Sequence, residues 1–390
     1  MPEIFDVIVI GAGPAGTSAA MHSAKLGLKT LLLEEHSKIG EPVHCGECLS
    51  QLAVKRFGMK LPKTVISAEV KGIKVIFPNR KSVVVKEKGF VLEKDKFEQF
   101  LGEKAKQNGA KIQLNCKAEE IKRKENLWAI KCNNNSFFQG KILIDATGAN
   151  AFTSSKLNLN KRFDSVIGIQ YRMQGISNDG FLDFYLWPEL APKGYLWMIP
   201  KSNGKANVGL VTEEKTKAKV FLDKFIKKNK WEKKTVKKTF GGMIPISGPK
   251  KTFDNALMLV GDAAGFTSPL FEGGTSLGLE SGKFAAQTAK KAIDKRDYSK
   301  TTLSEYESLW KKEFPDYNKM IKGKNALYNL NQEELNFFAS ILPEDITKVS
   351  LMDRIKIGFK IWFSKPELMW KGVASATKAL GYSRAKHYGW

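Results

Sequence analysis

The chain has 390 residues, of which 42% are hydrophobic and 27% charged, so it can bury a large core and is not a disordered protein. Lys and Arg number 64 against 40 Asp and Glu, a formal net charge of +24. This excess predicts attraction to an anionic partner such as a membrane surface, a phosphate-bearing ligand or nucleic acid, although lysines spread along the whole chain are also typical of a lysine-rich composition.

The sequence lacks the patterns of a membrane span and of a secreted protein. No apolar run approaches the roughly 18 residues that cross a bilayer, and the first residues lack the basic and then apolar order of a signal peptide. We therefore expect a cytoplasmic protein, with peripheral attachment to the inner face of the cell membrane as a further prediction. Four cysteines in the chain argue against a disulfide framework and agree with a reducing compartment.

Residues 6–34 carry the pattern of a nucleotide-binding strand, turn and helix. A β-branched run leads into a glycine-rich turn and a helical stretch, and a second apolar run ends in an acid. One glycine permits the turn, the next lets a pyrophosphate approach the backbone, and the last lets the helix sit close to the strand, while the acid can bind a ribose. The segment predicts a dinucleotide without deciding between NAD and FAD. The three glycines are Gly11, Gly13 and Gly16, and the acid is Glu34.

The segment from Cys45 to Cys48 has several interpretations. A zinc site needs four ligands, and a single Cys-x-x-Cys pair with four histidines in the chain argues against one, so we expect no metal. The spacing allows a redox-active dithiol. Two buried small side chains are a further alternative, which suits Cys48 better than Cys45. Cys116 and Cys132 are interpreted as structural.

Alternating residues predict an antiparallel sheet at 68–88, 166–174, 181–187 and 194–211, the last with a turn at 202–204. Tyr195 and Trp197 lie on one face of an extended segment there, because alternate side chains of a strand point the same way. Such a pair of rings suits an ordinary core or the wall of a cavity for a long apolar ligand.

Two more buried strands end in turns of small residues. The first spans residues 142–145 and runs into Ala146-Thr147-Gly148, and the second spans 256–260 and runs into Gly261-Asp262. A second glycine-rich turn at 272–275 opens a helix of small residues.

The last third of the chain predicts helices at 303–314, 333–342 and 351–363. In the last of these the apolar residues fall on one side and the basic residues elsewhere, which is typical of a helix in a membrane interface. Packing of that side on the protein body fits the pattern equally well. The apolar residues are Leu351, Ile355, Phe359, Trp362 and Phe363.

In combination, these segments resemble the geranylgeranyl reductase family of flavoproteins over nearly the first 300 residues. The resemblance implies an α/β fold in which a Rossmann-like FAD-binding domain is interleaved with an antiparallel-sheet substrate domain and followed by a helical C-terminal region. The FAD-binding domain would comprise 1–66, 89–165 and 250–300, the substrate domain 67–88 and 166–249, and the helical region 301–390.

The resemblance also implies how FAD is held. The family's aspartate at the flavin ribityl chain falls on Asp262, and the amides at the pyrimidine edge fall on Gly274 and Thr275. Lys94 stands where the family has an arginine that contacts the cofactor, and a lysine lacks the bidentate fork. Ala118 matches the residue whose backbone meets the adenine. The dinucleotide turn adds Gly11, Gly13, Ala15, Gly16 and Glu34.

Two further segments match the family near the substrate. Similar reductases line the reactive edge of the flavin with a segment that here includes Cys45, Gly46 and Cys48, so that Cys45 would face the ring and serve as the candidate proton source. Cys48 stands where the family usually has a glycine, as does Glu272 before the final glycine pair. Tyr195 and Trp197 match the motif that walls the substrate cavity.

The implied activity is an FAD-dependent hydrogenation of isolated C=C bonds in the geranylgeranyl chains of archaeal membrane ether-lipid precursors, with hydride from N5 of the reduced flavin. No second dinucleotide motif occurs, so the electron donor is either reduced nicotinamide or a protein such as ferredoxin. One alternative is a flavin monooxygenase of the same fold that acts on an apolar substrate. An alternative of another class is a basic membrane- or nucleic-acid-binding protein, but no nucleic-acid module accompanies the charge.

Overall fold

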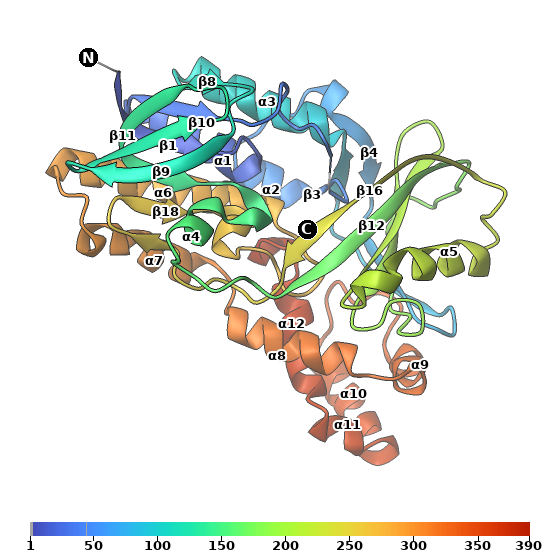
Figure 1. Ribbon diagram of the computed structural model, residues 1–390. Helices are drawn as coiled ribbons and strands as arrows, with labels where there is room; N and C mark the ends of the chain where they lie inside the picture. Colours follow the sequence, from blue (N-terminus) through green and yellow to red (C-terminus); the bar gives the residue numbers. More distant parts are fainter. Residues whose placement is uncertain (1–2, 44) are drawn as a thin grey trace.

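The computed structural model describes residues 3–43 and 45–390. Two lobes lie side by side, and a group of C-terminal helices extends below them (Figure 1). The first lobe contains a sheet whose strands β11, β1 and β2 run parallel to one another. Its strand order is β17-β18-β11-β1-β2-β8, and β10 and β9 extend it from β11. The strands are β1 (Ile4–Ile10), β2 (Thr30–Leu33), β8 (Lys111–Gln113), β9 (Ala118–Lys124), β10 (Leu127–Cys132), β11 (Phe137–Asp145), β17 (Phe253–Asp254) and β18 (Leu257–Leu259).

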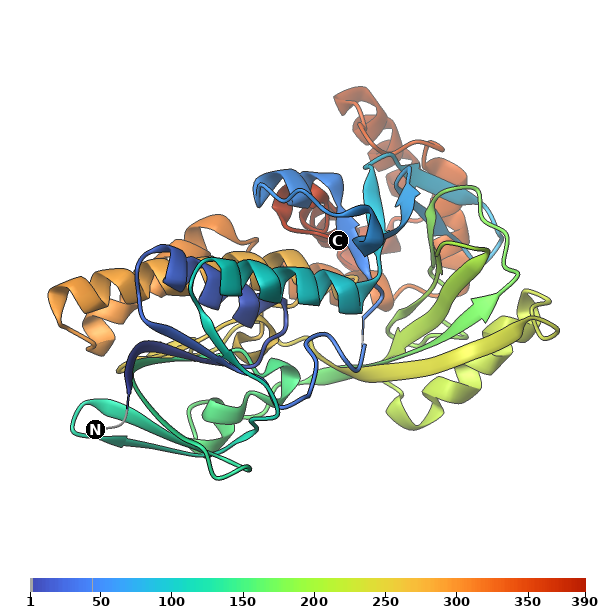
Figure 2. The ribbon, with the colours of Figure 1, turned by 90° about the horizontal axis from the view of Figure 1, so that it is seen from above.

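Helices cover this sheet because its central strands are apolar on both faces, as is usual for parallel strands. Helices α1 (Pro14–Lys25), α3 (Lys94–Gln107) and α6 (Thr275–Lys295) lie together on one side of it, as Figure 2 shows. Helix α7 (Lys300–Glu313) also packs into this core, and the Tyr306 hydroxyl donates a hydrogen bond of 2.7 Å to the Leu259 carbonyl. The first residues of the predicted C-terminal region therefore share the core of the first lobe.

The β9–β10 hairpin brings two cysteines together. The sequence argued against a disulfide framework and gave Cys116 and Cys132 a structural role, and these two residues form a disulfide. The hairpin register pairs Cys132 with Ala118 and brings the two cysteine Cα atoms to 5.6 Å, a separation that a disulfide spans readily. The sequence did not predict this pairing, because a cysteine count does not reveal which cysteines lie opposite each other.

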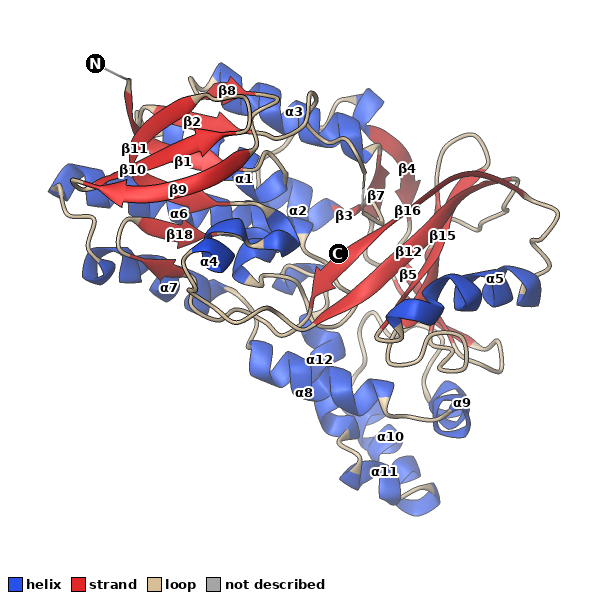
Figure 3. Ribbon diagram, in the orientation of Figure 1, coloured by secondary structure: helices blue, strands red, loops and turns tan. Residues whose placement is uncertain are grey.

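The second lobe contains the predicted sheet, with the strand order β16-β12-β15-β14-β13-β5-β6 (Figure 3). Neighbouring strands are antiparallel except β13 and β5, which pair in parallel. Trp197 faces Gly209 on the next strand, where an added Cβ would lie 2.6 Å from the indole. The strands are β5 (Ile73–Ile76), β6 (Ser82–Val85), β12 (Ser165–Gln174), β13 (Leu182–Tyr185), β14 (Tyr195–Pro200), β15 (Lys205–Thr212) and β16 (Thr235–Pro245).

Smaller elements complete the two lobes. A three-stranded sheet of β3 (Cys48–Ser50), β7 (Gly89–Leu92) and β4 (Ile66–Val70) takes the start of the predicted 68–88 stretch, so that only its later part joins the large antiparallel sheet. The sequence did not predict strand β16, which lies beyond the last predicted stretch. The remaining helices of the lobes are α2 (Gln51–Arg56), α4 (Phe152–Lys156) and α5 (Ala218–Lys228).

The C-terminal helices cover one face of the second lobe's sheet. Residues of α8, α9, α10 and α12 form one apolar cluster with Tyr195 and Trp197 of β14. The predicted helices at 303–314, 333–342 and 351–363 are confirmed as α7, α9 and α10. In the described ranges, no helix is long and apolar enough to cross a bilayer. The bounds are α8 (Tyr317–Tyr328), α9 (Gln332–Ile341), α10 (Leu351–Ser364), α11 (Glu367–Trp370) and α12 (Val373–Tyr382).

Candidate cofactor and substrate site

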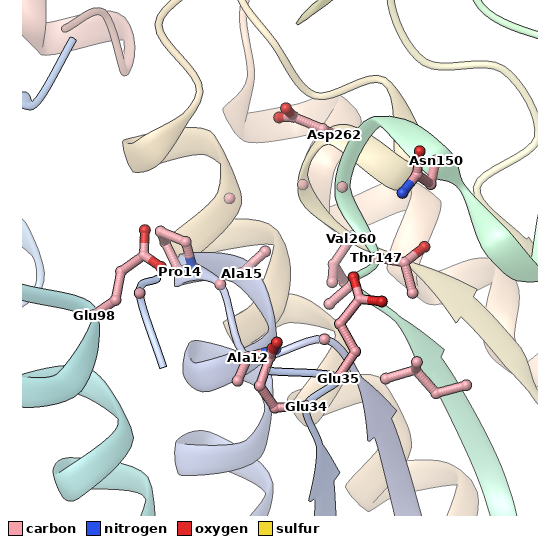
Figure 4. Close-up of a pocket in the computed structure, with 18 of the residues that line it drawn as sticks. Ala12, Pro14, Ala15, Glu34, Glu35, Glu98, Thr147, Asn150, Val260 and Asp262 are labelled. Carbon is pink, nitrogen blue, oxygen red and sulfur yellow. The ribbon is translucent and has the colours of Figure 1, made fainter. Parts of the chain in front are cut away.

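A cavity of about 630 Å³ lies at the carboxyl ends of the parallel strands and is shown in Figure 4. Open α/β sheets bind their ligands at this edge. Most of the residues predicted to hold the cofactor line this one cavity, although they come from distant parts of the chain. They are Gly11, Gly13, Ala15, Glu34, Cys45, Gly46, Lys94, Ala118, Asp262, Gly274 and Thr275.

The glycine turn between β1 and α1 has the features that the sequence predicted. Gly11 has a φ of +98°, and a Cβ at Gly16 would lie 1.8 Å from the Gly11 carbonyl oxygen. Gly16 is not among the residues that line the cavity, and its role is to let α1 pack closely on the turn. Gly13, by contrast, has no heavy atom within 4 Å of an added Cβ. That open space, next to a helix N-terminus with no side-chain cap, suits a phosphate group.

Glu34 at the end of β2 holds the same turn in place. Its Oε2 accepts a hydrogen bond of 2.8 Å from the Ala12 amide, and its Oε1 accepts one of 3.0 Å from the His36 amide. The carboxylate lines the cavity and keeps lone pairs for ribose hydroxyls. Ala118 lies in the lining together with Cys116, so the disulfide belongs to this part of the site.

Asp262 lies in the short turn Gly261–Ala264 that follows β18. The Thr267 hydroxyl donates to its Oδ1 at 3.1 Å, and burial raises the pKa of the Asp262 carboxyl. Gly274 passes so close that an added Cβ would lie 3.2 Å from this oxygen. Helix α6 begins at Thr275 without a side-chain cap, so its first amides are free to meet an electron-rich ring edge.

Lys94, the residue at the family's arginine position, is buried at the start of α3. Its Nζ lies 3.4 Å from Glu98 Oε1 and donates to Thr275 Oγ1 at 3.3 Å. Burial alone would lower the pKa of Lys94, but attraction by Cys45, Glu98 and Glu47 outweighs it and raises that pKa. The residue therefore brings a permanent positive charge to the cavity.

The predicted reactive segment is only partly in the cavity. Cys45 and Gly46 line it, whereas Cys48 begins β3 and donates its thiol to the Gly46 carbonyl at 3.7 Å. Burial raises the pKa of Cys45 more than nearby Lys94 lowers it, and burial holds the pKa of Cys48 well above its ordinary value. Both cysteines are free thiols and stay protonated near neutral pH.

Glu47, between the two cysteines, is a residue whose importance the sequence did not reveal. Its side chain is 1% exposed and its φ is +73°. Its Oε2 accepts hydrogen bonds from Arg172 at 2.6 Å, Lys201 at 2.9 Å and Asn207 at 2.5 Å. These partners belong to the second lobe, so this carboxylate ties the Cys45 segment to the antiparallel sheet. The sequence did not reveal this role, because a single acid in a loop belongs to no repeating pattern of helix or strand residues.

Tyr195 and Trp197 lie behind the cavity and do not line it. Tyr195 packs on Phe184, Phe271 and Trp197, with ring centroids 5.1 to 5.7 Å apart. The Trp197 indole donates to Gln170 Oε1 at 3.1 Å, and the Gln170 amide donates to the Cys45 carbonyl at 2.7 Å. One glutamine thus connects the aromatic wall with the cavity.

Several lining residues were missed by the sequence analysis, including Asn150, Phe152 and Ile244. The sequence predicted the turn at 146–148 but not the residue that stabilises it. Buried Asp145 accepts hydrogen bonds from the amides and hydroxyls of Thr147 and Thr153. Over the described ranges, no group of three or more His, Cys, Asp or Glu residues could hold a metal ion.

These features fit a flavin dinucleotide. Open space at Gly13 and an uncapped helix suit the pyrophosphate, Glu34 suits the ribose, and the uncapped start of α6 suits the ring. None of the described residues that line the cavity conflicts with FAD.

Family models match two separate parts of the chain. Residues 6–153 match the model for FAD dependent oxidoreductases, and residues 164–244 match the model for the geranylgeranyl reductase catalytic domain. The second match covers strands β12 to β16 almost completely.

Curated relatives and solved structures agree with these models. The digeranylgeranylglycerophospholipid reductase of Methanocaldococcus jannaschii is 33% identical over 94% of this chain and 97% of its own length. The protein of the same name from Methanococcus vannielii is 34% identical over 95% of this chain and 97% of its own. A geranylgeranyl bacteriochlorophyll reductase-like protein from Thermoplasma acidophilum has a TM-score of 0.87 at 32% identity and covers 95% of this chain and 99% of its own. A flavin-dependent brominase shares the fold with a TM-score of 0.75 at 17% identity.

Proposed function

The chain belongs to the digeranylgeranylglycerophospholipid reductase family of FAD-dependent oxidoreductases, and from this premise we propose that it hydrogenates isolated C=C bonds in the geranylgeranyl chains of a membrane ether-lipid precursor. One observation carries the proposal. The Cys45 carbonyl, Gln170 and Trp197 form a continuous chain of hydrogen bonds from the cofactor cavity to the aromatic wall. The cavity therefore adjoins the apolar cluster around Tyr195 and Trp197, beside which the isoprenoid would lie.

The residues of this chain have separable tasks in that reaction. FAD, when bound and reduced, supplies a hydride. Asp262, Lys94 and the first amides of α6 would hold and orient the cofactor, and Cys45 lines the same cavity. Tyr195 and Trp197 lie behind the cavity and would keep water out of that side of the site, and the isoprenoid would gain free energy in proportion to the apolar area that leaves water. Because an isolated alkene is unactivated, alignment in a dry site supplies much of the rate.

The test of this function uses the purified full-length protein. We expect it to be yellow, to bleach on anaerobic reduction with dithionite, and to regain its colour when a geranylgeranyl ether lipid is added, with saturated chains in the product by mass spectrometry. Return of colour only with oxygen, coupled to a hydroxylated product, would instead identify a monooxygenase. A colourless protein that refuses added FAD would contradict both and leave the binding-protein alternative.

The electron donor is external to the site in this proposal. The described residues contain one dinucleotide-binding glycine turn, at Gly11–Gly16. We propose that reduced nicotinamide or a ferredoxin-type protein reduces the flavin in a transient encounter. Anaerobic mixing of the oxidised protein with each donor separates the two, because only the true donor bleaches the flavin within the time of one turnover.

We also propose that the protein works as a peripheral protein on the inner face of the cell membrane. Helices α10 and α11 lie at the lower end of the molecule (Figure 1), where Ile361 and Leu368 anchor them to the apolar cluster of the second lobe. Their large apolar side chains are exposed, Phe363 by 79% and Trp370 by 91%. Three exposed basic residues lie on α10. They are Arg354, Lys356 and Lys360. Apolar anchors beside cations are the chemistry of an interfacial helix on anionic lipid.

The paired change Phe363→Ser and Trp370→Ser is expected to weaken binding to anionic phosphatidylglycerol vesicles at least tenfold. Each large apolar side chain contributes about 1.5–3 kcal/mol when it leaves water. Vesicle sedimentation at low and high salt measures the effect. Phe137→Ser is the matched control, because Phe137 is 52% exposed on strand β11 of the other lobe. Equal vesicle binding by all three proteins would disprove this orientation.

A further inference from the structure

Glu272 is an acid at a position where the resemblance to the family leads one to expect glycine. It lines the same cavity as Cys45, Asp262 and Gly274. Its φ is +45° and that of Phe271 is +65°, a left-handed backbone that disfavours side chains and would suit glycine better. Strained backbone of this kind concentrates at functional sites. Glu272 therefore places a large side chain at a position whose backbone conformation favours glycine.

The surroundings of Glu272 keep its carboxyl group dry and poorly partnered. Its Oε2 is buried and has no hydrogen-bond partner among the described residues. The Tyr195 hydroxyl, which donates to the Phe271 carbonyl at 3.0 Å, also interacts with the Glu272 carboxyl. Glu272 thus stands where the cofactor cavity meets the aromatic wall. This is the place at which the proposed substrate would bring its alkene.

The titratable groups that face Glu272 come from two elements. Tyr195 lies on β14, and Lys324 and Tyr328 lie on α8, where Lys324 forms an ion pair of 3.5 Å with Glu213. Burial raises the pKa of Glu272 to about 8, although Lys324 and Tyr195 act against the rise. Glu272 is consequently a neutral acid at pH 7, and a stronger one than the Cys45 thiol, whose pKa is raised above that of an ordinary cysteine.

We propose that Glu272 is the general acid of the reduction and gives its carboxyl proton to the alkene. This inference rests on the proposed function. The O–H bond of Glu272 breaks and a C–H bond forms at one alkene carbon, while the other carbon receives the hydride that reduced FAD supplies. Glu272 is left as a carboxylate, the cofactor is left oxidised, and a water molecule returns the proton to Glu272 before the next turnover.

Single-turnover reoxidation by geranylgeranyl lipid tests the role of Glu272. In the prereduced wild type we expect the rate to fall about tenfold per pH unit above pH 8, because the carboxylate has no proton to give. In Glu272→Gln we expect a rate about 100-fold lower at pH 7, with no dependence on pH in that range. Cys45→Ala is the comparison variant, since it removes the thiol that the sequence made the candidate proton source, and it should keep the wild-type fall above pH 8.

A second readout does not involve turnover. The Glu272 pKa is 4.5 without the protein environment and about 8 in the folded protein, so folding favours its protonated form. The stability of the wild type should therefore fall as the pH rises from 5 to 8 relative to Glu272→Gln, which has no proton to lose. Thermal unfolding of both proteins across this range measures the difference. Should the glutamine variant fold poorly, Glu272→Gly replaces it, because glycine accepts the left-handed backbone.

The outcomes separate this inference from the proposed function. A Glu272→Gln protein that turns over within twofold of the wild type and shares its pH profile overturns the inference, and a Cys45→Ala protein that loses the pH dependence assigns the proton to Cys45. A wild type that does not reoxidise with lipid at all overturns the proposed function instead. In that case the unfolding experiment still reports whether Glu272 holds a proton.

Discussion

A Gly16→Ala protein is expected to lose at least about 100-fold in FAD affinity, or roughly 2.8 kcal/mol, and to unfold more easily. An alanine Cβ at this position would lie 1.8 Å from the Gly11 carbonyl oxygen. Because Gly16 lies in the first turn of α1 and Gly11 lies in the loop that precedes this helix, the helix can make room only by moving away from the strand. That movement displaces the amides that would bind the pyrophosphate.

Gly13→Ala is the matched control for this change. Gly13 has a φ of −67°, and an added Cβ meets no heavy atom within 4 Å, so the apoprotein should keep its thermal stability. The same methyl group enters the cavity, so FAD should still bind more weakly. Flavin fluorescence titration and apoprotein unfolding measure the two effects. If Gly16→Ala binds FAD as tightly as the wild type, the assigned role of the turn is wrong.

Glu47→Ala is expected to lower the free energy of unfolding by about 3–5 kcal/mol. The change leaves Arg172 and Lys201 in a buried site without the carboxylate that both contact. It also frees the loop that carries Cys45, because Asn207 loses its hydrogen bond to the same oxygen. Reduced lipid turnover should accompany the loss of stability. Urea unfolding and single-turnover reoxidation measure the two results.

Glu93→Gln provides the comparison for Glu47. Glu93 forms an ion pair of 3.3 Å with the same Lys201, but its side chain is 25% exposed, whereas that of Glu47 is 1% exposed. Ion pairs that water reaches contribute about 0–1 kcal/mol, so this variant should stay within about 1 kcal/mol of the wild type. Equal losses for the two variants would show that Glu47 is an ordinary partner of Lys201 and no special link between the lobes.

Glu47 and Glu272 differ in how their carboxyl groups are paired. Glu47 is fully paired, with three donors on one oxygen, and so holds the reactive loop against the sheet. Glu272 has an oxygen without a partner and faces the cavity, so its proton is free to react. The pairing of each carboxylate, and not its residue type, separates the structural acid from the proposed reactive one.

The sequence by itself determined the features that depend on local backbone requirements. The sequence predicted the glycine turn at 11–16, the strand that ends before Glu34 and the turn at Asp262. It also predicted the helices at 303–314, 333–342 and 351–363. Tight turns demand glycine, buried strands demand apolar runs, and helices repeat every 3.6 residues. Such demands act over a few neighbouring residues, so the order of the residues records them.

Only the tertiary structure decided which distant residues meet. Glu47 contacts residues more than 120 positions away in the chain, and Glu272 meets Tyr195 across 77 positions. The Cys116–Cys132 disulfide, the exposure of α10 and the position of Tyr195 and Trp197 behind the cavity likewise depend on how whole elements pack. Long-range packing leaves no periodic pattern in a single sequence, because each contact depends on the fold of all the residues between its partners.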